Sequence, residues 1–183
     1  MPRAVALLRA INVGGRFVKM EKVRALATGA GLENVSTYIQ SGNILFDCSA
    51  REAARTETKL EALWKDELGW DITTLVRTQK EIAELFAEGA DLAHGLKGKD
   101  VRHYVSFLRA ELPKSAIEEL HGWSYAKERL LVRGRELHFW CTIPSHEAKY
   151  SNSRMEKVAK TQATTRDWKT VVALQELFGS TAR

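Results

Sequence analysis

A six-residue pattern occurs twice in the chain, one hundred residues apart. Residues 5–10 and 105–110 both begin with valine, end in Leu-Arg-Ala and are mainly apolar over the length of a strand. A helical spacing of apolar residues and then a hairpin follow each copy. This internal repeat indicates that two similar halves share one molecule, and it constrains the fold more than any other feature of the sequence.

The first half has the predicted order β-α-β-β-α-β. Apolar residues three and four apart predict helices over residues 20–30 and 53–68, and Gly31 and Gly69 follow these helices as C-terminal caps. Strands are predicted at residues 5–11, 35–40, 43–47 and 71–77. This is the order of a ferredoxin-like unit, in which two helices cover one face of a sheet.

The second half repeats the strand, the helix and the hairpin. A short helix over residues 79–88 leads into a polar stretch, 89–99, which we interpret as a linker. The elements predicted after it are a strand at 103–110, a helix at 113–121, a hairpin of residues 129–132 with 136–142, and a basic helix at 151–161. Thr164 and Asp167 have the Thr-x-x-Asp spacing of an N-terminal cap, which predicts a last helix from Trp168 onward.

These patterns predict an α+β fold of two ferredoxin-like halves that form one compact molecule. We place the first half at residues 1–95 and the second, with an extra C-terminal helix, at residues 96–183. With 44% hydrophobic and 28% charged residues, the composition is that of an ordinary folded protein, which excludes the disordered and fibrous classes.

Membrane and metal-binding classes find no support in the sequence. The first apolar run is too short for a signal-peptide core, and no later run approaches the ~20 residues of a membrane span, so we expect a cytoplasmic protein with no membrane partner. Cys48 and Cys141 stand far apart, and the five histidines lack the close spacing of metal ligands. We therefore expect reduced cysteines, no metal and no cofactor.

Charge is unevenly distributed along the chain, whose net charge is +5. Lys and Arg outnumber Asp and Glu by six to three in residues 1–50 and by sixteen to ten in residues 97–183, whereas acidic residues prevail by ten to six between them. The pattern fits a basic face that attracts phosphates or nucleic acid, and it equally fits ordinary solvation. The charge alone leaves both interpretations open.

Two polar loops are predicted to meet at one edge of the first sheet. In a ferredoxin-like half, the end of the first strand, the turn between the second and third strands and the start of the first helix lie at the same edge. Glycines there allow close approach of an anion to backbone N–H groups, and amides and cations orient it. We call this the polar-loop site, and its candidate residues are Arg9, Asn12, Gly14, Gly15, Arg16, Gln40, Ser41 and Asn43.

A purely structural role for these residues is an open alternative. Gly14 and Gly15 are also suited to a tight turn, and Asn43 to closing a hairpin through its own backbone. Thr165 and Arg166, at the predicted start of the last helix, form a second candidate anion site, whose alternative is a helix cap beside a core tryptophan.

Three segments resemble a bacterial family known as domain of unknown function 1697. They are Ala-Leu-Leu-Arg-Ala-Ile-Asn-Val-Gly-Gly at 6–15, Thr-Tyr-Ile-Gln-Ser-Gly-Asn at 37–43 and Ala-Thr-Thr-Arg-Asp-Trp-Lys-Thr at 163–170. The family usually shows Asn-Trp-Asn where this chain has Asp-Trp-Lys, and glycine is commoner at the position of Ala10. The resemblance implies ferredoxin-like substructure and brings no established activity.

The sequence leaves open whether the chain is an enzyme, because it contains no catalytic triad, nucleophile elbow or clear carboxylate pair. The leading hypothesis is a cytoplasmic protein that binds a small phosphorylated or carboxylated ligand at the polar-loop site. One alternative is an RNA-binding module that uses aromatic residues of the second half for base stacking, namely Tyr104, Phe107, Phe139 and Trp140. Another is a protein-interaction domain that pairs through a sheet edge, and the oligomeric state stays open.

Overall fold

The computed structural model describes residues 2–12, 14–15, 17–97 and 100–180. Within these residues the chain has the predicted α+β fold, and it contains two four-stranded antiparallel sheets. Contacts divide it into two compact units. Unit 1 contains the described residues of 1–84 and 174–183, and unit 2 those of 85–173. The division into domains at residues 1–95 and 96–183, which the sequence predicts, remains a prediction.

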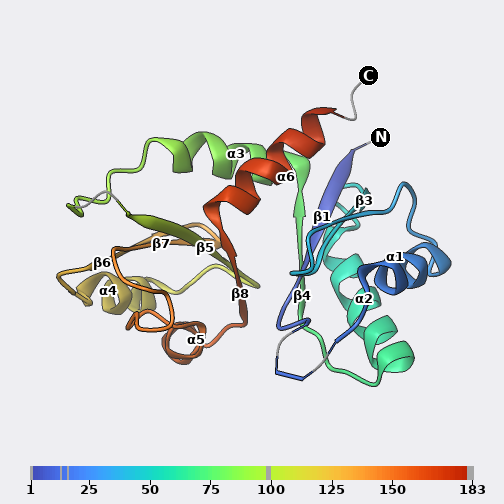
Figure 1. Ribbon diagram of the computed structural model, residues 1–183, viewed down its shortest axis with the longest axis horizontal. Helices are drawn as coiled ribbons and strands as arrows, with labels where there is room; N and C mark the ends of the chain where they lie inside the picture. Colours follow the sequence, from blue (N-terminus) through green and yellow to red (C-terminus); the bar gives the residue numbers. More distant parts are fainter. Residues whose placement is uncertain (1, 13, 16, 98–99, 181–183) are drawn as a thin grey trace. The chain divides into compact units, whose positions relative to one another are not determined.

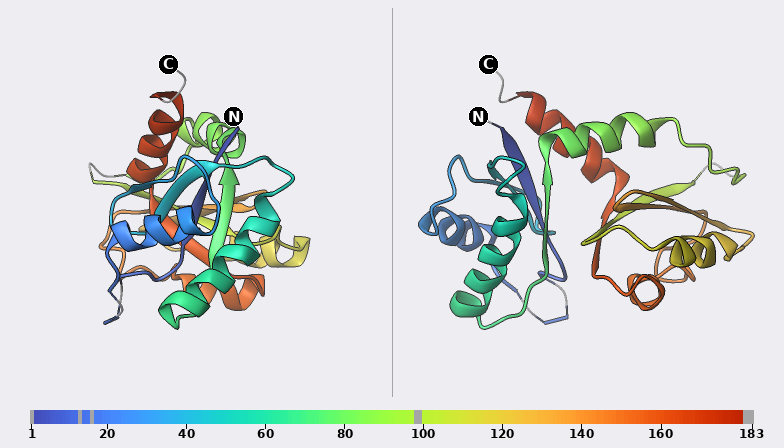
Figure 2. Two further views of the ribbon diagram at one scale, coloured as in Figure 1. Left: turned by 90° about the vertical axis from the view of Figure 1, so that its right-hand side faces the viewer. Right: turned by 180° about the vertical axis from the view of Figure 1, so that it is seen from behind.

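Unit 1 has the predicted βαββαβ order. Its sheet has the strand order β2-β3-β1-β4 with every neighbouring pair antiparallel, which is the arrangement of a ferredoxin-like sheet. The elements are β1 Arg3–Leu8, α1 Met20–Gly29, β2 Ser36–Tyr38, β3 Asn43–Asp47, α2 Ala53–Leu68 and β4 Thr74–Thr78. Figures 1 and 2 show α1 and α2 on the same face of this sheet.

Unit 2 repeats this arrangement with the strand order β6-β7-β5-β8. Its elements are β5 Arg102–Leu108, α4 Lys114–Gly122, β6 Glu128–Arg133, β7 Glu136–Cys141, α5 Asn152–Ala159 and β8 Ala163–Asp167. Two more helices, α3 Gln79–Ala90 and α6 Trp168–Ser180, directly follow β4 and β8. The predicted C-terminal helix therefore exists, and α3 holds the equivalent position after the first βαββαβ unit.

Strand β8 corrects the sequence interpretation of residues 164–167. The Thr-x-x-Asp spacing predicted a helix cap there, whereas Ala163–Asp167 pairs with β5 as an edge strand. Only Asp167 acts as a cap, because its Oδ1 accepts the N–H of Lys169 at 2.8 Å. The strand was missed because its side chains lack the strict alternation of polarity on which a strand prediction depends.

The two sheets have matching registers. In unit 1, Val5 lies opposite Leu45 and Arg77, and in unit 2, Val105 lies opposite His138 and Arg166. Matching backbone bonds join Leu8 to Gly42 and Leu108 to Arg135, both at 2.8 Å. The sequence repeat therefore corresponds to structurally equivalent positions, and through the same registers Cys48 matches Cys141 and Lys80 matches Lys169.

Each unit buries its own core between the sheet and the helices. In unit 1 the alternate residues Ala4, Ala6 and Leu8 of β1 face Val23 of α1 and Trp64 of α2, and all five are fully buried. In unit 2 a second cluster joins α4 and α5 to the sheet through residues such as Leu120, Met155, Leu137, Phe139 and Leu108. At ~25 cal/mol per Å² of buried apolar surface, these clusters are the main stabilising contribution to each unit.

Glutamates from the covering helices bind the outer edge of each sheet. On β4, the N–H groups of Thr74 and Val76 donate to Glu61 and Glu57 of α2, at 2.9 and 2.7 Å. On β8, the N–H of Ala163 donates to Glu156 of α5 at 2.7 Å. These N–H groups point away from the neighbouring strand. By accepting them, the carboxylates leave fewer unpaired backbone groups with which another strand could pair at either edge. No helix in the described part of the chain combines the length and apolar character of a membrane span.

Candidate functional site

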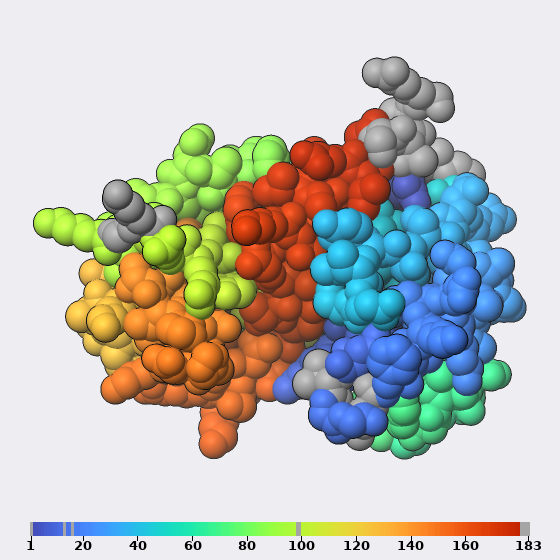
Figure 3. All heavy atoms as spheres, viewed as in Figure 1, coloured from blue at the N-terminus to red at the C-terminus, as the bar shows by residue number. Residues whose placement is uncertain are grey.

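The two polar loops of unit 1 meet, as the topology predicts. The side-chain amide Nδ2 of Asn12, in the loop after β1, donates to the carbonyl of Gln40 at 3.0 Å and lies 3.4 Å from its Oε1. The backbone N–H of Leu8 donates to the carbonyl of Gly42 at 2.8 Å. The two loops are therefore joined by side-chain and backbone bonds, while ligand binding between them stays a prediction. The loop that follows β1, blue in Figure 3, lies on the visible surface.

The two asparagines hold the loops in shape. The Oδ1 of Asn12 accepts the N–H of Val18 at 2.7 Å, which connects Asn12 to the residues directly before α1. Asn43 is fully buried, and its Nδ2 donates to the carbonyl of Tyr38 and to the hydroxyl of Ser41, both at 3.0 Å. These amides are therefore engaged with the protein, and the groups that face solvent are the glycine backbone and the remaining side chains of the loops.

Replacement of Asn43 by alanine is expected to destabilise the chain by about 1–3 kcal/mol, because it removes a buried hydrogen-bond donor from two acceptors. Urea unfolding followed by circular dichroism measures this loss. Ser41→Ala is the control, since it removes only one of the two acceptors and leaves the amide in place. Equal stability of Asn43→Ala and the unaltered chain would contradict a structural role for the amide.

Both loops contain strained backbone. Ala10, Asn12 and Ile39 have φ values of 53°, 58° and 50°, in the left-handed region that residues other than glycine seldom occupy. Gly14 and Gly15 follow at 65° and 84° with open space around the position of a Cβ. For a β-branched residue such as Ile39 this conformation costs about 1–3 kcal/mol, and such strain clusters at functional sites.

Apolar side chains are exposed on the same loops. Phe17 is 68% and Ile39 49% exposed, and these are the exposed large hydrophobic residues in the described part of the chain. Beside Phe17 lies a cavity of about 370 Å³. Its lining combines two cations with apolar surface and one carboxylate: Phe17, Val18, Lys19, Lys22, Glu67, Leu68 and Trp70.

The other predicted site residues of unit 1 differ in accessibility. Gln40, like Gly14 and Gly15, is exposed. Ser41 and Arg9 are half-buried, and the backbone N–H of Arg9 donates to the carbonyl of Thr73 at 2.8 Å. Arg16 lies outside the described residues. The groups most accessible to a ligand are thus in the segment from Gly14 to Lys22 and at the tip of the hairpin.

The second predicted anion site does not have the expected geometry, because Thr165 and Arg166 lie in β8 and not at a helix N-terminus. Arg166 is buried, and its Nη1 donates to the hydroxyl of Thr164 and the carbonyl of Thr165, both at 2.9 Å. Burial lowers the pKa of Arg166 to about 10, which keeps it charged at neutral pH. The Oγ1 of Thr165 donates to Asn152 Oδ1 at 2.6 Å. The argument from a helix dipole therefore does not apply to these residues.

Unit 2 contains a column of stacked rings that the sequence did not predict. His103 lies between Trp140 and Trp168, with ring centroids 4.6 and 4.5 Å away. Phe86 also stacks on Trp168 at 6.1 Å, and His94 on Trp140 at 5.9 Å. Spacing indicated only that His138 and Trp140 share a face of one strand, because the other rings come from distant segments.

Two histidines of this cluster are bonded to each other and neutral. Nε2 of His103 lies 3.0 Å from Nδ1 of His138, and one of the two nitrogens donates. Burial lowers the pKa of His138 to about 4, and burial together with the neighbouring His138 and His94 lowers that of His103 to about 3. The buried Nε2 of His138 has no hydrogen-bond partner within the described residues.

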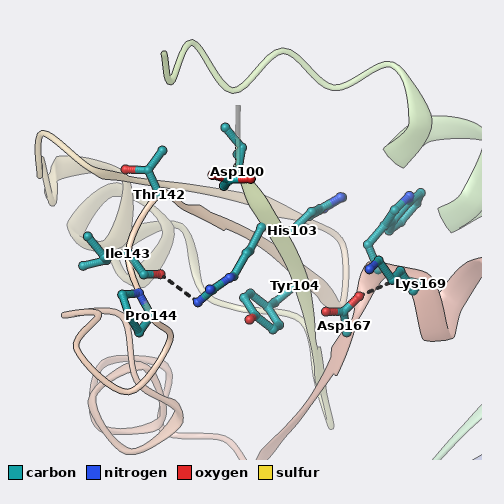
Figure 4. A pocket seen from close by; sticks show the side chains of 11 residues that line it. Asp100, His103, Tyr104, Thr142, Ile143, Pro144, Asp167 and Lys169 are labelled. Atoms are coloured by element: carbon teal, nitrogen blue, oxygen red, sulfur yellow. Dashed lines mark hydrogen bonds between the residues drawn. The ribbon is translucent and has the colours of Figure 1, made fainter. Parts of the chain in front are cut away.

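A larger cavity, of about 670 Å³, lies at the end of the second sheet. It forms where β5 begins, β7 ends and β8 continues into α6 (Figure 4). We call it the Arg102 pocket, and its lining is Asp100, Val101, Arg102, His103, Tyr104, Thr142, Ile143, Pro144, Asp167, Trp168 and Lys169. Among these residues the sequence indicated Tyr104 for base stacking, and Asp167 with Trp168 as the helix cap and core tryptophan beside the second candidate anion site.

The aromatic residues proposed for RNA binding are not exposed platforms. Phe107, Phe139 and Trp140 are buried, and Tyr104 is half-buried against Phe139 with ring centroids 5.8 Å apart. Stacking of bases on this set would require them to leave the core. Among the residues that the structure describes, no group of three or more His, Cys, Asp or Glu side chains could hold a metal ion.

Comparisons with known proteins show the family of the chain and a solved structure of similar architecture. The model of the family described as Protein of unknown function (DUF1697) matches residues 1–138. A solved structure, that of the conserved bacterial protein SP0830 from Streptococcus pneumoniae, is similar at 25% identity and a TM-score of 0.67 over 96% of this chain and 97% of that chain. No match was found among curated proteins.

Proposed function

We propose that this chain, which belongs to the family of proteins of unknown function DUF1697, binds a small phosphorylated or carboxylated molecule at the polar-loop site. One observation carries the proposal. The exposed large apolar side chains of the described chain, Phe17 and Ile39, lie on two loops that Asn12 joins by hydrogen bonds. Two exposed large apolar side chains, one of them on the strained backbone of Ile39, add little to the stability of the chain alone, which favours contact with a bound molecule.

The surroundings of the loops favour an anionic group on that molecule. The exposed Gly14 and Gly15 leave space for close approach to the backbone. Lys19, directly before α1, makes no side-chain cap, and Lys19 and Lys22 both line the adjacent cavity. Two ammonium groups beside the start of a helix attract a phosphate or carboxylate more strongly than the single carboxylate of Glu67 repels it.

The ligand of this site would also carry apolar surface. Phe17, Leu68 and Trp70 line the same cavity as the two lysines. A volume of about 370 Å³ is at the lower end of the range of small-molecule pockets. The chemistry therefore fits a compact acid with an apolar portion better than a long polymer. Gln40 and Ser41 of the hairpin are our candidates for hydrogen bonds to it.

A thermal-shift series at low salt tests the proposal with inorganic phosphate, citrate, a hexose phosphate and adenosine monophosphate. A ligand at a hundred times its dissociation constant adds ~2.7 kcal/mol, or roughly 5–10 °C for a chain of this size. The double variant Gly14→Ala/Gly15→Ala is expected to lose the shift, because a Cβ strains the loop and narrows access to its N–H groups.

Gly95→Ala is the matched control, since Gly95 also has a positive φ, 66°, and open space but lies in unit 2. It imposes the same kind of strain and is expected to keep the ligand-dependent shift. The absence of a shift with every small anion, or an unchanged shift in the double glycine variant, would overturn the proposal. A shift with short RNA alone would favour the RNA-binding alternative.

A further inference from the structure

The repeat places a pocket at the same position in both units. In unit 1 a cavity of about 440 Å³ lies where β1 begins, β3 ends and β4 continues into α3, and Pro2, Cys48 and Thr78 are part of its lining. The Arg102 pocket of unit 2 lies where β5 begins, β7 ends and β8 continues into α6. The fold itself therefore creates a hollow at this corner, and the side chains decide its chemistry.

The register identifies which residues differ between the two pockets. Ala4 lies opposite Phe46 and Thr78, and the equivalent Tyr104 lies opposite Phe139 and Asp167. Arg102, opposite Cys141, corresponds to Pro2, which bonds through its carbonyl to Cys48. Unit 1 thus forms the same corner with proline, alanine and threonine. The guanidinium, phenol and carboxylate of unit 2 are not required by the fold.

These three groups lie together and have unused hydrogen-bonding capacity. Tyr104 and Asp167 are direct cross-strand neighbours, and Arg102 lies two residues before Tyr104 on the same face of β5. Within the described residues, the Tyr104 hydroxyl has no partner and Arg102 makes only a long bond of 3.5 Å to the Ile143 carbonyl. Asp167 accepts only the N–H of Lys169, and Figure 4 shows it beside Tyr104.

The wall of the pocket is rigid and partly apolar. His103 and Trp168 are held in the ring column, and a Cβ on Gly89 of α3 would lie 2.3 Å from the Trp168 ring, so that the helix packs directly on it. Ile143 and Pro144 form an apolar corner on the other side (Figure 4). A preformed cavity that combines apolar surface with convergent polar groups is typical of small-molecule sites.

We infer that the Arg102 pocket binds a small zwitterion with an apolar side chain, a free amino acid or a short peptide. Arg102 and Lys169 provide cations for the ligand's carboxylate, and Asp167 and Asp100 provide carboxylates for its ammonium group. The Tyr104 hydroxyl lies between them, and Ile143 with Pro144 contacts the apolar side chain. A ligand with a single sign of charge would leave one of these charged pairs without a partner.

Isothermal titration calorimetry with leucine and with leucyl-leucine tests this inference and distinguishes the amino acid from the peptide. Measurable binding of at least one of them is expected, and N-acetylation or C-amidation of that probe is expected to weaken it at least tenfold, because each removes one charge. Arg102→Ala and Asp167→Asn are expected to cause losses of the same size.

Lys80→Ala in unit 1 is the matched control, because Lys80 occupies the position equivalent to Lys169 in the other pocket, and it is expected to leave binding unchanged. Three results would each overturn the inference: no binding of either probe at millimolar concentration, equal binding of the blocked derivatives, or unchanged binding by Arg102→Ala. The polar-loop variants Gly14→Ala/Gly15→Ala act on a different site and should not affect this binding.

Discussion

Acidification from pH 7 to about pH 4.5 is expected to lower the free energy of unfolding by about 3 kcal/mol, before most carboxylates are protonated. The cause is the pair formed by His103 and His138, whose pKa values in the folded chain are lowered to about 3 and about 4. In the unfolded chain both titrate near 6.5. The unfolded state therefore binds more protons in this window, and stability is fully present above about pH 6.5 and falls as the pH falls.

The size of the effect follows from the difference between the final pH, about 4.5, and the pKa of histidine in the unfolded chain, about 6.5. At two pH units below 6.5, two fully shifted groups would contribute ~5 kcal/mol, which solvent screening of the incompletely buried His103 reduces to about 3. Below about pH 3 the histidine contribution levels off, because both states are then protonated. Burial is the main cause of both pKa shifts; the neighbouring His138 and His94 add to the shift of His103, and the charge of Arg133 adds to that of His138.

Urea unfolding at a series of pH values between 7.5 and 4.5 measures this loss. His103→Phe retains a ring between Trp140 and Trp168 but removes one titrating group, so the slope of stability against pH is expected to fall by about half. His146→Gln is the control, since the exposed His146 should leave the slope unchanged. A flat profile for the unaltered chain would show that the histidine pair accepts protons in the folded state.

The fold was predictable because short-range sequence patterns indicate most of its elements, and these patterns occur in both halves. Both strands that end in Leu-Arg-Ala are followed by amphipathic helices and hairpins, and each of these signals depends on spacing within ten or so residues. The bounds of α2 agree with the prediction, since a clear apolar face precedes a glycine cap at Gly69. Strand β8 was not predictable, because its buried residues Thr164 and Arg166 are polar. Their burial depends on hydrogen bonds, such as the one between these two side chains, that the sequence does not show.

For the candidate sites, too, one part was predictable from the sequence and another was not. The approach of the loops at Asn12 and Gln40 followed from topology, since strand order decides which loops share an edge. The roles of individual side chains did not follow, because Asn43 is equally suited to a ligand contact and to a buried hairpin bond. The ring column around His103 depends on segments up to 82 residues apart, from Phe86 to Trp168, which no local pattern relates.

Alanine in place of Glu128 is expected to destabilise the chain by about 3 kcal/mol, the other large effect. Glu128 begins β6 and is 3% exposed, and its carboxylate accepts the N–H groups of Lys149 and Tyr150 at 2.9 and 3.0 Å. Those bonds fix the segment that leads from β7 into α5, where Tyr150 stacks on Trp123 with centroids 5.7 Å apart. Without the carboxylate, the N–H of Tyr150 loses its acceptor in the buried interior, and that of Lys149 loses its acceptor at a partly buried position.

Glu128→Gln separates the hydrogen bonds from the rest of the side chain. Glutamine keeps one acceptor oxygen and almost the same volume, so about half of the loss is expected, whereas alanine removes both oxygens. Urea unfolding gives the free energies, and tryptophan fluorescence reports the loosening of Tyr150 from Trp123 independently. Stability of Glu128→Ala within ~0.5 kcal/mol of the unaltered chain would mean that the loop holds its shape through its other contacts, such as the bond from the Tyr150 hydroxyl to the Trp123 carbonyl at 2.9 Å.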